Sequence, residues 1–267
     1  MDTNVKFNIM GRYDYNRIFI SDQEQETIRN CRVFIGGAAS GSVIAECALR
    51  LGFEKMTLVD NSSVQMSDLN RHNFTMEDIG HNKAEAVGRR LLSINPDADI
   101  RVIDRTINQD NAEALLEGHS IAVNAIDISA ESRAETNLAF DNVCENMNIT
   151  VIHPYNIGFA SLVVVVKPGK PRLAILKENG DAAEERFERA VIEYIDRYFD
   201  HKANPKIWLD QLLWATVDTK EERLPEMSIA AYIAGGVCTN LLYKLACGKF
   251  VKFFPNFYFY SAKDDMN

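Results

Sequence analysis

Residues 31–51 read CRVFIGGAASGSVIAECALRL, and this stretch decides the fold. A short apolar run ends at two glycines, which is the pattern of a buried strand that meets a tight turn. A helix is then predicted from Ser40, because apolar residues recur on one face of the following segment. Those residues are Val43, Ile44, Cys47, Ala48 and Leu51. The stretch therefore predicts a strand, a glycine-rich turn and a helix that packs against the strand.

The same alternation of strands and helices continues outward from this stretch. The predicted strands are 55–60, 100–104, 120–127 and 150–153, and the predicted helices between them are 84–94, 111–117 and 131–148. Such alternation favours a parallel sheet with right-handed crossovers. We therefore expect an α/β fold with a Rossmann-like, doubly wound, mostly parallel sheet.

The pattern changes in the second half of the chain. Residues 160–167 read ASLVVVVK, and together with 250–260 they predict antiparallel strands that extend the sheet. The charged segment 177–227 between them has mainly helical periodicity and predicts a helical insertion. No linker marks a boundary, so we expect a single domain over 1–267.

The bulk composition excludes several classes of protein. The net charge of −9 argues against broad nucleic-acid binding, which needs clustered Lys and Arg. The start MDTNVKFNIM lacks the pattern of a signal peptide, and Gly and polar residues interrupt the apolar segment 228–248. The five cysteines are scattered without C-x-x-C spacing, which indicates neither a zinc site nor a disulfide framework. We expect a cytoplasmic protein with no membrane partner.

The glycine turn contains Gly36, Gly37 and Gly41. A glycine-rich turn between a strand and a helix allows phosphates to approach the backbone and the positive end of the helix. Ala38 occupies the second glycine position of the usual fingerprint, so a tight turn with close helix packing explains the pattern equally well. The turn alone does not choose between these interpretations.

Two acids follow predicted strands. Asp60 ends the second strand and Asp127 the fourth, so both are expected at the carboxyl edge of one sheet, where such folds bind ligands. One acid would accept hydrogen bonds from ribose hydroxyls, and the other would bind Mg²⁺. An Asp in this position is also common as a turn former or a helix cap.

Residues 59–83 supply basic side chains between these acids. Arg71 and Lys83 provide the positive charge that a leaving pyrophosphate requires. Lys83 begins a predicted helix, where the helix dipole disfavours a cation, so a bound anion would explain its position. The alternative is an exposed surface lysine. Acids, basic residues and a glycine turn together indicate nucleotidyl transfer, with ATP and Mg²⁺ as cofactors, rather than hydride transfer.

Motifs along more than half of the chain resemble the ThiF/MoeB/HesA family, the prokaryotic relatives of ubiquitin-activating enzymes. The resemblance runs from 12 to about 169 and again over 225–248. The matching stretches are RYDYNRIFIS, VFIGGAASGS, TLVD, LNRHNF, DIGHNKAEA, INPDADI, NAIDIS and IGFASLVVVVKPG.

The resemblance implies an ATP- and Mg²⁺-dependent adenylyltransferase that acts on the C-terminal carboxylate of a small ubiquitin-like protein or peptide. It also implies a homodimer in which Arg17 reaches the ATP of the other subunit. The roles implied for the other residues are ribose binding by Asp60, phosphate binding by Asn70, Arg71 and Lys83, and metal binding by Asp127.

The chain departs from the family pattern at several positions. Ala38 and Ala39 stand where glycines are usual, Asp68 replaces the usual first Asn of the N-L-x-R segment, and His72 replaces the usual Gln. No cysteine lies between Cys144 and Cys238, where a thioester-forming nucleophile is expected. We therefore expect adenylation without a thioester held by this chain.

Three alternatives stay open. The first is a catalytically degenerate member of the family that dimerises and binds a ubiquitin-like partner. The second is a tRNA-modifying dehydratase of the same family, which the acidic composition disfavours. The third is a nicotinamide-dependent oxidoreductase, which leaves Arg71, Lys83 and Asp127 without a common role.

Overall fold

The computed structural model describes residues 9–126, 131–170 and 225–263. They contain a seven-stranded sheet in the order β3-β2-β1-β4-β5-β6-β7. The strands are β1 Arg32–Gly36, β2 Lys55–Val59, β3 Asp99–Ile103, β4 Ile121–Asn124, β5 Thr150–Ile157, β6 Ala160–Val166 and β7 Phe257–Ser261. Strands β1 to β5 are parallel, and β6 and β7 are antiparallel to their neighbours. The predicted fold class is confirmed.

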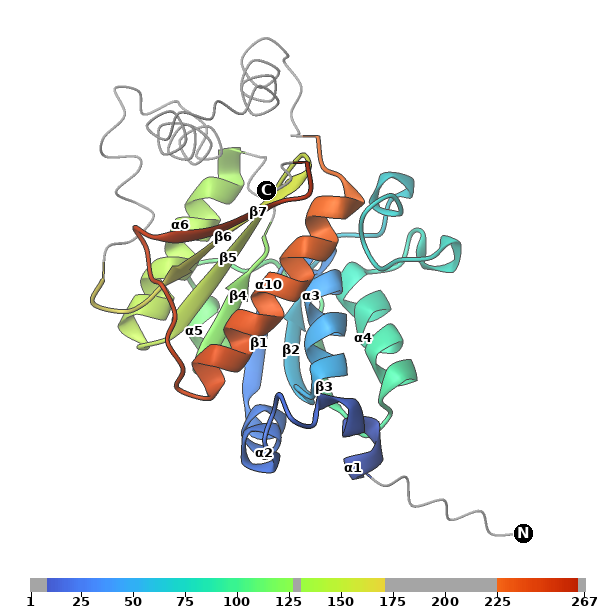
Figure 1. Ribbon diagram of the computed structural model, residues 1–267. Coiled ribbons are helices and arrows are strands. Elements are labelled where there is room, and N and C mark those ends of the chain that lie inside the picture. The colour runs from blue at the N-terminus through green and yellow to red at the C-terminus, as the bar shows by residue number, and fades with distance from the viewer. Residues whose placement is uncertain (1–8, 127–130, 171–224, 264–267) are drawn as a thin grey trace.

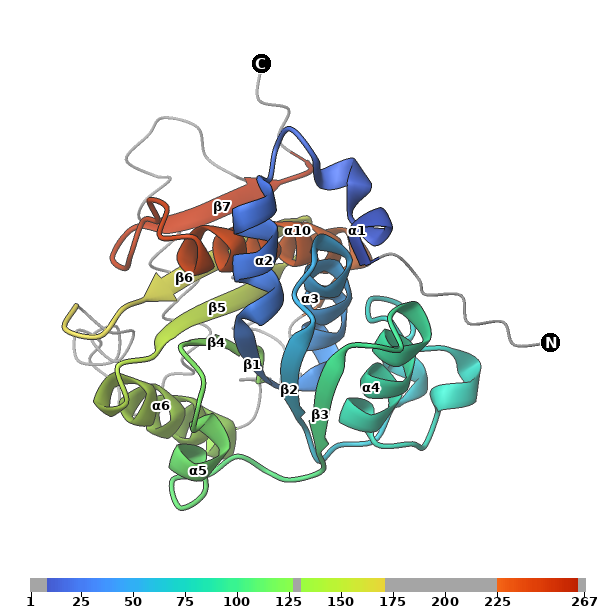
Figure 2. The ribbon, with the colours of Figure 1, turned by 90° about the horizontal axis from the view of Figure 1, so that it is seen from below.

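Helices cover both faces of the sheet, as Figures 1 and 2 show. Helices α3, α4 and α10 lie on one face, and α5 and α6 lie on the other. The helices are α1 Ile9–Arg12, α2 Asp22–Asn30, α3 Ala38–Leu51, α4 Lys83–Ile94, α5 Ala112–Leu116, α6 Glu131–Asn146 and α10 Ser228–Ala246. Short 3₁₀ helices are η1 Asp14–Asn16, η2 Met66–Asp68 and η3 Met76–Asp78.

Strand β1 shows why the sheet is buried on both faces. Its side chains alternate, so Val33 and Ile35 join the core under α3 and α10. Phe34 joins the core on the other face, where it stacks on Phe140 at a centroid distance of 5.6 Å. Continuous apolar strands of this kind are typical of parallel sheets.

The interrupted apolar segment 228–248 forms helix α10 over Ser228–Ala246. In length and hydropathy it meets the criteria for a membrane-spanning helix, which is weak evidence by itself. It packs against α3, β5 and β6. Its buried residues include Ala234, Cys238 and Leu242.

Several predicted boundaries are wrong. Strand β5 runs to Ile157 instead of ending at 153, because its second half pairs with β6, and α6 ends at Asn146 instead of 148. Helix α3 begins at Ala38 rather than Ser40, because a carboxylate distant in sequence caps the Ala38 amide. Strand β4 ends at Asn124, whose side chain turns back to accept the Ile126 amide at 3.4 Å. Strand β7 spans Phe257–Ser261, so it begins seven residues later and ends one residue later than the predicted 250–260. Pro255 lacks the N–H that strand pairing needs, which explains why β7 begins after it.

Candidate functional site

Asp60, Asn70, Arg71 and Lys83 lie along the segment from the end of β2 to the start of α4, which is teal in Figure 1 and leaves the sheet at its carboxyl edge. The glycine turn is built for close packing at this edge. Gly37 has φ +86°, and a Cβ atom there would lie 2.3 Å from the carbonyl oxygen of Ala125. A Cβ at Gly41 would lie 2.7 Å from Cγ2 of Ile35, and one at Gly36 would also be crowded. The tight-turn interpretation of this motif is therefore confirmed.

Asp60 caps the helix that follows this turn. Its Oδ2 accepts the backbone N–H of Ala38 at 2.7 Å, while Oδ1 accepts the N–H and the hydroxyl of Ser62 at 2.8 and 2.6 Å. A carboxylate offers about four acceptor positions, so these three bonds leave one for a further donor. The helix-cap interpretation is confirmed, and one acceptor position of the carboxylate stays available.

Lys83 forms an ion pair with Asp68. The Lys83 Nζ lies 3.0 Å from Asp68 Oδ2, and the two side chains are 12% and 4% exposed. Lys83 is therefore not the exposed surface lysine of the alternative interpretation. The anion that its position at a helix start requires is supplied by this chain.

Asp68 is ionised in spite of its burial. Burial raises the pKa of Asp68, but the interactions with His72, the Gln65 amide and Lys83 outweigh it and hold the pKa below its usual range. The Gln65 amide donates to Asp68 Oδ2 at 2.9 Å, and His72 Nδ1 lies 3.5 Å from Oδ1. Asp68 and His72, two departures from the family pattern, thus lie side by side.

Backbone contacts bring Lys83 close to Asp60. The Lys83 N–H donates to the carbonyl of Ser62 at 2.9 Å. The Asn82 side chain donates to the carbonyl of Asp60 at 2.9 Å and caps α4 by accepting the Glu85 amide at 3.0 Å. Asp60 and Lys83, the candidates for ribose and phosphate binding, are therefore held near each other at the two ends of the segment between β2 and α4.

Arg71 also pairs with an acid. Its Nε donates to Glu226 Oε2, while Nη1 donates to the Ser67 carbonyl at 2.7 Å and to Asn70 Oδ1 at 2.9 Å. Asn70 thus lies beside Arg71, as a joint role requires. Glu226 was not predicted from the sequence, because it lies 155 residues from Arg71 and belongs to no local motif.

The loop that carries Arg71 is fixed on α3. The Asn73 amide donates to the Ser42 hydroxyl at 3.1 Å. The Asn73 side chain donates to the buried Glu46 at 2.9 Å and accepts from the Tyr232 hydroxyl at the same distance. These contacts join the loop to α3 and α10.

Arg17 is not part of this edge within one chain. Asn16 next to it bonds to the Leu51 carbonyl at 2.9 Å, at the opposite end of α3. Arg17 is exposed and donates to the carbonyl of Asp14 at 2.8 Å. A role at an ATP site would have to be in another subunit.

Two predicted features lie outside the described residues. These are Asp127, the expected metal ligand, and residues 171–224, which include most of the expected helical insertion. In the part of the chain that the structure describes, no group of three or more His, Cys, Asp or Glu side chains is arranged to hold a metal ion.

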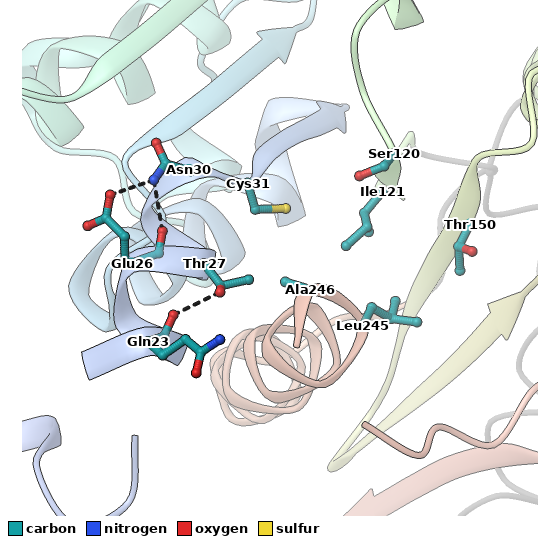
Figure 3. Close-up of a pocket in the computed structure, with 10 residues that line it drawn as sticks. All are labelled: Gln23, Glu26, Thr27, Asn30, Cys31, Ser120, Ile121, Thr150, Leu245 and Ala246. Carbon is teal, nitrogen blue, oxygen red and sulfur yellow. Dashed lines mark hydrogen bonds between the residues drawn. The ribbon is translucent and has the colours of Figure 1, made fainter. Parts of the chain in front are cut away.

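A cavity of about 700 Å³ opens at the opposite edge of the sheet (Figure 3). Its lining combines polar side chains of α2 with the starts of β4 and β5 and the end of α10. Burial raises the pKa of the Cys31 thiol in this lining to about 11, which disfavours a reactive thiolate. The candidate nucleotide-binding residues lie at the carboxyl edge, so we assign the site there.

Comparison with known proteins finds a family that matches nearly the whole chain. The model of the ThiF family matches residues 13–266. The sulfur carrier protein ThiS adenylyltransferase of Bacillus subtilis (strain 168) is 30% identical over 165 residues, which cover 60% of this chain and 48% of that protein. The ubiquitin-like modifier-activating enzyme 5 of Drosophila erecta is 32% identical over 157 residues, covering 56% of this chain and 38% of that protein. The chain thus spans less than half the length of these curated relatives.

Solved structures share the fold. The tRNA N6-threonylcarbamoyladenosine dehydratase of Escherichia coli, solved in complex with AMP, superposes with a TM-score of 0.65. The match covers 90% of this chain and 95% of that one at 17% sequence identity. Such low identity establishes the likeness of the fold alone.

Proposed function

Because the chain belongs to the ThiF family, we propose that it is an ATP-dependent adenylyltransferase that activates a C-terminal carboxylate. The observation that carries this proposal is the arrangement of Asp60 and Lys83 at the carboxyl edge of the sheet. There Asp60 caps the helix after the glycine turn, and Lys83 is tied to the same loop through Ser62. Ribose and phosphate binding need this combination of an acceptor, a helix start and a cation.

In the proposed reaction, a substrate carboxylate oxygen attacks the α-phosphorus of ATP. The bond from that phosphorus to the bridging oxygen breaks, which yields an acyl adenylate and pyrophosphate. Lys83 and Arg71, with Asn70 beside them, would stabilise the charge on the leaving pyrophosphate, and Asp60 would orient the ribose. We keep Asp127 as the proposed ligand of Mg²⁺, an ion that supplies further positive charge at the phosphates.

We propose a small ubiquitin-like protein or a peptide as the carboxylate substrate. The names of the Bacillus and Drosophila relatives support this class, since one activates a sulfur carrier protein and the other a ubiquitin-like modifier. We also propose a cytoplasmic homodimer. Its support is the exposure of Tyr15, Ile18 and Phe19 around Arg17, at 93%, 94% and 83%. Large apolar side chains so exposed are common at interfaces.

The test is ATP–pyrophosphate exchange in the presence of purified ubiquitin-like proteins that end in Gly-Gly, with tRNA as a separate arm. Exchange that depends on a free C-terminal carboxylate and fails in Asp127→Ala would support the proposal. If the folded wild type binds ATP but no carboxylate elicits exchange, adenylation of this substrate class is wrong.

One observation favours a second candidate, the catalytically degenerate binding module. Both predicted phosphate-binding cations already have carboxylate partners, Asp68 for Lys83 and Glu226 for Arg71. A protein without nucleotide chemistry can keep such pairs as structural contacts. In that case the chain would bind a ubiquitin-like partner without ATP and would catalyse no exchange.

A further inference from the structure

The ion pair between Arg71 and Glu226 joins distant parts of the chain at the proposed phosphate site. Arg71 lies between η2 and η3, whereas Glu226 directly precedes the cap of α10. Their side chains are 17% and 26% exposed, so water screens the pair only in part. The contact uses Nε, on one of the edges of the planar guanidinium through which arginine binds carboxylates and phosphates.

Glu226 is held in place by its backbone. It forms a parallel β-bridge with Gly158, directly after β5, and Met227 next to it is the N-cap residue of α10. The Asn70 side chain lies 3.5 Å from the Glu226 carbonyl oxygen. The carboxylate is therefore presented to Arg71 by a fixed segment rather than by a free surface side chain.

We propose that Glu226 is an internal competitor for Arg71, so that a nucleotide phosphate can bind both Nε and Nη2 of the guanidinium only by displacing this carboxylate from Nε. The inference rests on the proposed function, because it assigns Arg71 to ATP phosphates. A carboxylate and a phosphate oxygen seek the same N–H donors, and the Nε–H that Glu226 occupies does not bind both fully.

The competition makes Glu226 a determinant of nucleotide affinity. An anion that contacts Arg71 alone must break the ion pair and gains little. A triphosphate that also contacts the start of α3 and the Lys83 ammonium, which has further N–H donors beside its bond to Asp68, gains interactions that offset the loss of the Arg71 pair. Glu226 would therefore favour polyphosphates over single phosphate groups.

The test measures ATP affinity by isothermal titration calorimetry on the full chain and on Glu226→Gln. Glutamine keeps the size of the side chain but removes the charge. We expect ATP to bind about fivefold more tightly to Glu226→Gln, as for the release of a partly buried ion pair. Glu77→Gln is the matched control, since Glu77 is exposed on η3 and its loss changes only the general charge.

Two further arms isolate the mechanism. In an Arg71→Met background, the Glu226→Gln gain should vanish, because no guanidinium is left to release. Adenosine, which has no phosphate, should bind wild type and Glu226→Gln alike.

The outcomes separate this inference from the proposed function. If wild type binds ATP but Glu226→Gln binds it equally or more weakly, Glu226 is a structural or supporting residue and the inference is overturned. The same holds if the gain persists without Arg71. If no folded variant binds ATP, the proposed function and the inference fail together. Melting temperatures of all variants confirm that they are folded.

Discussion

The ammonium nitrogen of Lys83 lies 3.0 Å from a carboxylate oxygen of Asp68, and this pair is enclosed at the start of α4. Asp68 also accepts the Gln65 amide, so it fixes the loop and the lysine together. Breaking one side of a buried ion pair leaves an uncompensated charge, which costs more than the pair contributes.

We predict that Asp68→Asn lowers the free energy of unfolding at pH 7 by about 1–3 kcal/mol. Asparagine keeps an acceptor for the Gln65 amide but leaves Lys83 without its counter-ion. Urea unfolding of both proteins measures the difference. Glu77→Gln, exposed on η3, should change stability by less than about 0.5 kcal/mol. Equal stability of Asp68→Asn and wild type would show that the pair contributes nothing.

The same residue predicts an acid dependence. The fold holds the pKa of Asp68 below its usual range, because its hydrogen bonds and Lys83 outweigh the effect of burial, which raises it. A lowered folded pKa contributes stability above the unfolded pKa of about 3.9, and this contribution is lost as the pH falls below that value. The stability difference between wild type and Asp68→Asn should therefore be constant from pH 7 to about pH 5 and should shrink at lower pH. A difference that grows on acidification would contradict this sign.

Two glycines, Gly37 in the glycine turn and Gly236 in α10, predict opposite effects of substitution by alanine. Gly37→Ala places a Cβ against the Ala125 carbonyl at a positive φ, so we expect a loss of more than about 3 kcal/mol. Gly236 lies within α10, where an added Cβ meets nothing within 4 Å. Gly236→Ala should stabilise the protein by about 0.5–1 kcal/mol, since alanine is the better helix former. Thermal unfolding of the two variants decides the sign of each effect.

Tyr13 anchors the segment that carries Arg17. Its hydroxyl donates to Glu54 Oε1 at 2.9 Å, and both residues are buried. We predict that Tyr13→Phe costs about 1–2 kcal/mol, because it removes a hydrogen bond to a charged group. Tyr15→Phe is the matched control, since Tyr15 is 93% exposed and should tolerate the change. Equal effects of the two substitutions in urea unfolding would refute the anchor.

The sequence was sufficient for the order of elements and for the sheet. Periodicity in β1 and α3 and the regular alternation after them depend on local residues, and the resulting parallel topology is confirmed. The ends of elements depended on contacts between distant residues. The start of α3 at Ala38 needs the carboxylate of Asp60, which local periodicity does not reveal.

The position of the candidate residues along the chain was predictable, but their ion-pair partners were not. Asp60 after β2 and Lys83 at the start of α4 lie where the order of elements predicts them. Glu226 was not predicted, since its role depends on how the start of α10 meets the loop after β2. Asp68 was noticed as a departure from the family pattern, but its ion pair with Lys83 became visible only in three dimensions.

The central claim is that the carboxyl edge of the sheet binds ATP, and calorimetric titration of ATP tests it most directly. Wild type, Lys83→Met and Lys55→Met are compared, with NAD⁺ as a second ligand. Lys55 begins β2 at the opposite edge, where it bonds to Asn30, so it matches the charge change away from the site. We predict that wild type and Lys55→Met bind ATP alike and that Lys83→Met binds at least about tenfold more weakly. Equal ATP binding by Lys83→Met, or binding of NAD⁺ in place of ATP, would contradict the account.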